Sequence, residues 1–106
     1  MIDINRRPED FGGTAVFAEK GLAPERDALT QRIGWFVISM YDAKPGETWM
    51  RSSLRNGSLQ FTCFPDRVSA EAFWESQCFS DFLYAIHEIT EDYVREALLA
   101  RGHQIG

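Results

Sequence analysis

Cysteine is scarce in this chain of 106 residues, which holds only Cys63 and Cys78. Two cysteines cannot form the disulfide framework that stabilises small secreted domains. Their spacing matches no zinc signature, and only His87 and His103 could complete a ligand set. We therefore predict no metal site and no cofactor, and we expect both thiols to be small buried apolar groups.

Long hydrophobic runs are also missing. The longest, from Trp35 to Met40, is interrupted by Ser39 and is far too short to span a bilayer. The residues at the start of the chain lack the basic and then apolar layout of a signal peptide. Gly12-Gly13 is a bare doublet that no phosphate-loop lysine follows. We predict a cytoplasmic protein with no membrane association and no nucleotide site.

Positive charge is in deficit, because the formal net charge is −5. Residues 1–65 carry eight acidic and eight basic side chains, whereas residues 66–106 carry eight acidic side chains and three arginines. The whole net charge therefore belongs to residues 66–106. Such an acidic excess repels nucleic acid and membranes and attracts basic protein surfaces.

What the chain does have is the composition of an ordinary globular domain, with 44% hydrophobic and 13% aromatic residues. Its length predicts a single domain over residues 1–106, with an irregular N-terminal arm at about 1–13. The predicted class is α+β: a three- or four-stranded antiparallel sheet packed by an upstream helix and two C-terminal helices.

The sheet prediction starts from Asn56-Gly57, since both residues tolerate the positive φ that a type I′ turn requires. This turn would pair a strand at 50–55 with a strand at 58–63. Residues 35–41 are apolar at nearly every position, which is typical of a strand covered on both faces. Together these segments predict a meander over residues 35–64.

Two further segments lie upstream of the meander. Residues 14–20 fit either a fourth strand or a short helix. Pro24 is well placed for the first turn of a helix that Leu29 and Ile33 would anchor and that ends near Gly34.

Two helices are predicted downstream. Ser69 can cap a helix over residues 70–79. A longer helix would begin at Ser80 or Asp81 and end at Arg101, because apolar side chains recur at helical spacing along it. Gly102 then takes the usual position after a helix end. A strand over residues 82–89 is the competing interpretation, and the long periodicity favours the helix.

The first candidate site is an acidic stripe on that long helix. Glu88, Asp92 and Glu96 are spaced four residues apart, and Glu91 lies beside them. The stripe is either a solvated helix face or a docking strip for a basic partner. A row on a convex helix does not converge as acid–base catalysis requires, so we expect no catalytic role.

The second candidate is the outward face of the predicted sheet. Arg51 and Arg55 project there, and Trp49 marks its far end. Arginine beside tryptophan is favoured in protein interfaces, although arginine stems also cover aromatic edges on ordinary surfaces. Tyr84 falls on the polar side of its predicted helix and adds an exposed aromatic residue.

No catalytic residue is predicted. Cys78 and His87 could form a thiolate–imidazole pair, but no third group is present to orient them. The favoured hypothesis is a small acidic, non-enzymatic interaction protein that binds and occludes a basic site on another protein, such as a toxin or a nuclease. Immunity proteins and anti-defence inhibitors share this profile in type and not in sequence.

The alternative is a homodimeric α+β protein, either a small-molecule-binding protein or an enzyme, with a pocket at the subunit interface. Trp35, Tyr41, Trp49 and Arg51 would then line an apolar cavity that contains one cationic anchor.

Overall fold

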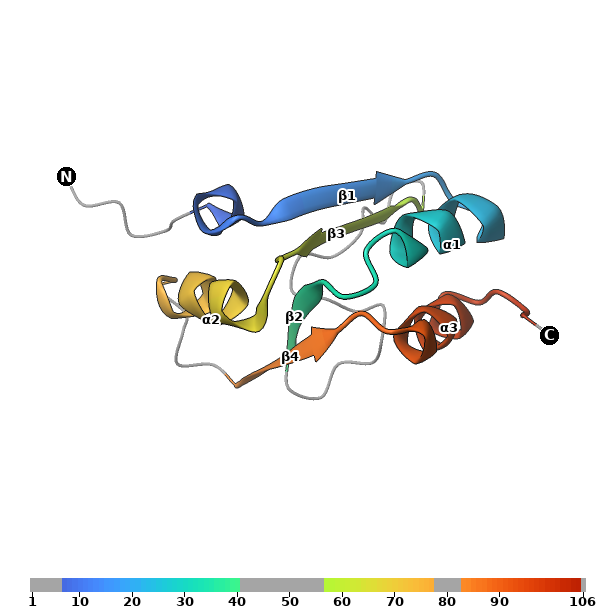
Figure 1. The fold of residues 1–106 in the computed structure, drawn as a ribbon. Helices are drawn as coiled ribbons and strands as arrows, with labels where there is room; N and C mark the ends of the chain where they lie inside the picture. Colours follow the sequence, from blue (N-terminus) through green and yellow to red (C-terminus); the bar gives the residue numbers. More distant parts are fainter. Residues whose placement is uncertain (1–6, 41–56, 78–82, 106) are drawn as a thin grey trace.

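Within residues 7–40, 57–77 and 83–105, which the computed structural model describes, four short strands form two antiparallel pairs and three α-helices pack against them (Figure 1). The elements in chain order are the 3₁₀ helix η1 (Pro8–Phe11), β1 (Thr14–Ala18), α1 (Leu22–Thr30), β2 (Phe36–Met40), β3 (Leu59–Cys63), α2 (Arg67–Glu75), β4 (Tyr84–Glu88) and α3 (Glu91–Ala100). The α+β class is confirmed. The arm at 1–13 is not wholly irregular, because η1 lies within it.

β1 pairs with β3 in a register that places Thr14 opposite Cys63 and Ala18 opposite Leu59. Because side chains alternate between the two faces of a strand, the apolar residues of both strands share one face and join the core. Residues 14–18 are therefore a strand, which was one of the two interpretations. Cys63 is fully buried, as expected, and burial raises the pKa of its thiol to about 11.

The predicted meander over residues 35–64 is not confirmed. β2 pairs with β4, β3 pairs with β1, and among the described residues β2 and β3 meet only at the bridge between Phe36 and Phe64. The strand predicted at 50–55 and its turn residue Asn56 lie outside the described residues. Pairing with β1 and β4 lets strands distant in the sequence cover the apolar faces of β2 and β3.

The prediction of one long helix up to Arg101 is wrong. Residues 84–88 form β4, whose register places Tyr84 opposite Met40 and Glu88 opposite Phe36. The competing interpretation, a strand, is correct for these residues, because backbone pairing with β2 outweighs their helical spacing. The helix starts only after Thr90, whose side chain accepts a hydrogen bond from the Tyr93 amide at 3.1 Å.

The other two helices differ from prediction at their ends. Pro24 lies in the first turn of α1 and Leu29 is buried, but α1 ends at Thr30 and Ile33 is 41% exposed. α2 begins at Arg67 and not at residue 70. Its cap is Asp66, whose Oδ1 accepts a hydrogen bond from the Ser69 amide at 2.7 Å.

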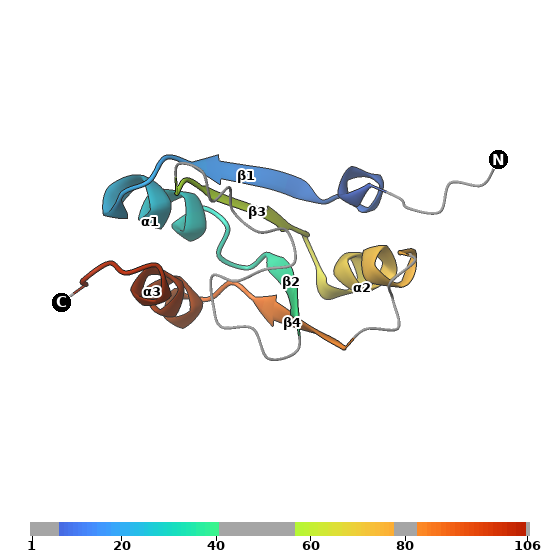
Figure 2. The ribbon, with the colours of Figure 1, turned by 180° about the vertical axis from the view of Figure 1, so that it is seen from behind.

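The core has two parts, at opposite ends of the strands. α1 and α3 cover one part, together with β1 and β3, and α2 covers the other (Figures 1 and 2). β2 contributes to both, since Val37 belongs to the first and Ile38 to the second. The prediction that this strand is covered on both faces is confirmed.

The cap of α2 gives a direct test of these helix bounds. Replacing Asp66 by alanine removes the acceptor of the Ser69 amide, and the free energy of unfolding should fall by about 1 kcal/mol. Ser69→Ala is the matched control and should change it by less than about 0.5 kcal/mol. Urea unfolding of both variants decides the matter, and a larger loss in Ser69→Ala would favour the cap predicted from the sequence.

Candidate functional site

The structure does not bring the predicted site residues together. Trp49, Arg51 and Arg55 lie outside the described residues, so their proposed role stays a prediction. Glu88 belongs to β4 and not to the helix, so the stripe at four-residue spacing does not exist as one helix face. Tyr84 does not lie on the polar side of a helix, because it is half-buried in β4 and stacks on Trp74 with ring centroids 4.9 Å apart.

The acidic side chains of the second half divide between two ends of the molecule. Glu71 and Glu75 lie on α2, while α3 carries the exposed residues Glu91, Asp92 and Glu96. α2 and α3 lie at opposite ends in both ribbon views (Figures 1 and 2). The acidic surface that the sequence predicted as one face is therefore two surfaces, and three of the predicted residues remain together on α3.

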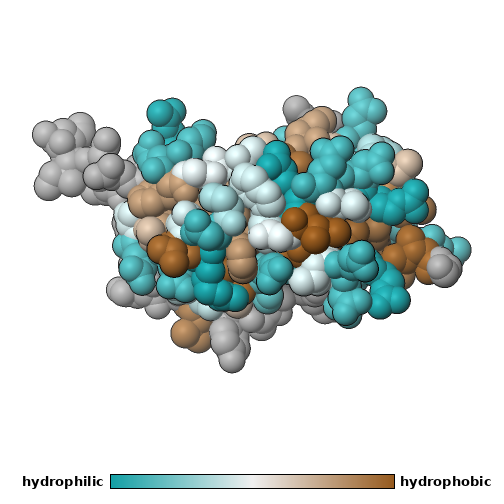
Figure 3. Space-filling model, viewed as in Figure 1, coloured by the Kyte–Doolittle hydropathy of each residue, from teal (hydrophilic) through white to brown (hydrophobic). Residues whose placement is uncertain are grey.

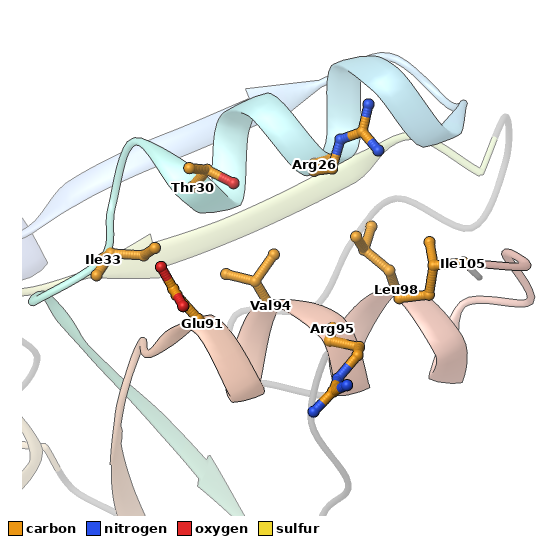
Figure 4. A pocket seen from close by; sticks show the side chains of 8 residues that line it. All are labelled: Arg26, Thr30, Ile33, Glu91, Val94, Arg95, Leu98 and Ile105. Atoms are coloured by element: carbon orange, nitrogen blue, oxygen red, sulfur yellow. The ribbon is translucent and has the colours of Figure 1, made fainter.

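An open groove of about 280 Å³ lies between α1 and α3, on the same end of the molecule as those three acids. Eight residues line it: Arg26, Thr30, Ile33, Glu91, Val94, Arg95, Leu98 and Ile105 (Figure 4). The space-filling view shows hydrophobic surface in the gap between α1 and α3, with hydrophilic side chains on either side (Figure 3). This is the candidate functional site.

The α3 side of the groove comes from a single helix face. Glu91, Val94, Arg95 and Leu98 are spaced three, four and seven residues apart, so they lie along one side of α3. Val94 and Leu98 extend toward α1 and are buried, while Ile33 supplies exposed apolar surface beyond the end of α1 (Figure 4).

The charged groups of the groove are oriented differently. The Glu91 side chain points toward the α1 side, near Ile33, whereas the Arg95 side chain points away from α1 (Figure 4). Arg95 Nη2 lies 3.2 Å from Asp92 Oδ1, an exposed ion pair that partly neutralises both groups. Glu91 is therefore the charge that α3 directs into the groove.

Sequence reasoning missed this groove. Its two walls are separated by about sixty residues of chain, and helical spacing does not reveal which helices become neighbours. The available signal was Ile33, an apolar residue just beyond the end of α1.

A buried ionic cluster fixes one end of the groove. The Glu25 side chain is 1% exposed, and its Oε1 accepts hydrogen bonds from Arg101 Nε and from His103 Nε2, the latter at 3.0 Å. Its Oε2 accepts a hydrogen bond from the Gly21 amide at 2.8 Å. Burial alone would raise the pKa of Glu25, but the hydrogen bonds from Arg101, Gly21 and His103 lower it below its ordinary value.

The same cluster holds the C-terminal segment against α1. Gly102, with a φ of 92°, ends α3 as predicted, and the His103 amide donates to the Leu98 carbonyl at 3.0 Å. Because His103 is bonded to Glu25, the chain beyond α3 folds back beside the helix pair and places Ile105 in the groove wall. The groove is therefore preformed and does not depend on a ligand to assemble it.

A second polar pair joins β2 to β4. His87 Nε2 lies 2.8 Å from Ser39 Oγ, the distance expected of a nucleophile and its base. Ser39 is only 2% exposed, and within the described ranges no carboxylate hydrogen-bonds to His87. Burial, together with the Arg67 charge, lowers the pKa of His87. This geometry is that of a cross-strand link. Cys78, its predicted partner, lies outside the described residues.

Within the described residues there is no group of three or more histidine, cysteine, aspartate or glutamate side chains that could hold a metal ion. In the same part of the chain no helix is long and apolar enough to cross a bilayer. Comparison of the chain with protein-family models, with curated proteins and with solved structures gives no match in any of the three.

The Glu25 cluster yields a stability prediction. Glu25→Gln leaves Arg101 without its buried counter-ion, so the free energy of unfolding at neutral pH should fall by about 2–4 kcal/mol. Asp27→Asn, an exposed change on the same helix, is the control and should alter it by less than about 0.5 kcal/mol. Equal losses in the two variants would contradict the anchoring role of Glu25.

The pH dependence follows from the direction of the same pKa shift. Because the pKa of Glu25 is lowered in the folded protein, its ionised carboxylate stabilises the fold above the pKa of the unfolded chain. That contribution is lost as pH falls through the folded-state pKa. Urea unfolding at a series of pH values should therefore show wild type and Glu25→Gln converging as pH falls from about 6 to about 3. A constant difference over this range would refute the assignment.

Proposed function

We propose that this chain is a non-enzymatic interaction protein that binds another protein through the groove between α1 and α3, and that the partner presents a basic surface with apolar side chains. One observation carries the proposal: an open apolar groove into which α3 directs the Glu91 carboxylate, with exposed Asp92 and Glu96 on the same helix.

The size and shape of the groove favour a protein partner. Small-molecule sites are typically enclosed cavities of about 300–1,000 Å³ that surround most of the ligand. The groove here has about 280 Å³ and lies open to solvent along the helix pair. Such a site can receive a few side chains of a partner while the surrounding charges set its orientation.

The charge of α3 supports a basic partner. Glu91, Asp92 and Glu96 outnumber Arg95, and Arg95 is already engaged with Asp92. Complementary charge accelerates encounter and suppresses wrong partners, while buried apolar side chains hold the complex. An immunity-type or inhibitor role, in which the basic site of a toxin or nuclease is occluded, agrees with this pattern.

The test is a matched pair of charge reversals. Glu91→Lys combined with Glu96→Lys changes the groove end of the molecule and leaves the Asp92–Arg95 pair intact. Glu71→Lys combined with Glu75→Lys makes the same change of charge on α2 at the other end. Each purified variant serves as bait at low salt in a lysate of the organism that encodes the chain, and mass spectrometry identifies the retained proteins.

The expected result is one basic protein that wild type and the α2 variant retain and the α3 variant loses. Its association rate with purified wild type should fall at least about tenfold between low and high salt. Equal retention by both variants would place the interaction elsewhere, and bait recovered only as a self-associated dimer would favour the homodimeric alternative.

A further inference from the structure

The groove has the dimensions of a site for a helix. The α3 residues that line it, from Glu91 to Leu98, cover two helical turns, or about 10 Å along the axis. α1 and α3 run in opposite directions along its two sides, so its walls are parallel ridges of side chains (Figure 4). An occupying helix would place apolar residues at positions i, i+3 or i+4, and i+7 along this length.

The groove offers apolar contacts along its whole length. Ile33 lies at one end and Ile105 at the other, and Val94 and Leu98 form the floor between them (Figure 4). The Glu25 cluster already orders the segment that carries Ile105. Little conformational entropy is therefore lost in this wall when a partner binds, which favours an occupant that presents a regular row of side chains.

Charge specifies what must flank that row. On the α3 side the occupant meets Glu91, with Asp92 and Glu96 beyond it, so a lysine or arginine is favoured there. On the α1 side it meets Arg26, which lines the groove, so an acidic residue is tolerated on that flank. A helix that carries acids on both flanks would oppose the α3 carboxylates.

We infer that the groove between α1 and α3 binds an amphipathic α-helix of the partner, whose apolar stripe is flanked on at least one side by lysine or arginine. This inference rests on the proposed function and adds the shape and chemistry of the bound segment.

Three synthetic helical peptides test it, each long enough to form a helix on docking, about 16 residues. The first has a leucine stripe flanked by lysine on one side and glutamate on the other. The second has the same stripe with glutamate on both flanks. The third keeps the flanks of the first and replaces the leucines by serine. Binding to the full chain is measured by fluorescence anisotropy at low salt.

The first peptide should bind at least about tenfold more tightly than the second, the factor that corresponds to 1.4 kcal/mol, and the third should not bind. Ile33→Glu should weaken the first peptide by a similar factor. Val68→Glu, at a 75% exposed apolar residue of α2, is the matched control and should leave binding unchanged. Glu91→Lys should reverse the preference and favour the second peptide.

Other outcomes overturn the inference in distinguishable ways. Equal binding of the first two peptides would remove the charge requirement. If none binds, yet the α3 charge reversal abolishes capture of a basic protein, the partner uses a different shape and the proposed function stands. If none binds and both charge reversals capture the same proteins, the inference and the proposed function fail together. Self-association that Ile33→Glu abolishes would assign the groove to a second copy of this chain.

Discussion

A buried carboxylate, that of Glu25, is the constraint on which the arrangement of α1 and α3 depends. Its removal from water is costly, and only charged and backbone partners at hydrogen-bond distance offset that cost. Those partners come from the turn before α1 and from the end of α3, and Arg101 reaches further to the Gly57 carbonyl at 2.7 Å. One ionised group thus joins parts of the chain that are far apart in sequence.

The groove is a consequence of that joining. With α1 and α3 held side by side and the C-terminal segment folded back, Ile33 and Ile105 mark its two ends. Its specificity comes from orientation more than from net charge, because Arg95 pairs with Asp92 while Glu91 points across the groove. The acids of α2 lie at the far end of the molecule and serve a different surface, so the total charge of −5 describes no single site.

Local features were predictable and neighbour relations were not. Gly102 ends α3 and Leu29 anchors α1, because backbone freedom and burial are local properties of these residues. Ile86 and Ile89 fit a helix or a strand equally well, and only β2, more than forty residues upstream, decides between them. Asp66 and Ser69 are both good cap residues, and backbone geometry selects Asp66. The groove required knowledge of which helices lie together, which no periodicity carries.

The alternation of side chains along β2 has a consequence for how the molecule responds to stress. Val37 and Ile38 are adjacent in sequence but belong to different parts of the core. Neither part can loosen without shifting the strand, and a shift of one residue would turn every side chain toward the wrong part. The two ends of the molecule are therefore mechanically coupled, and damage to packing under α2 is felt at the groove between α1 and α3.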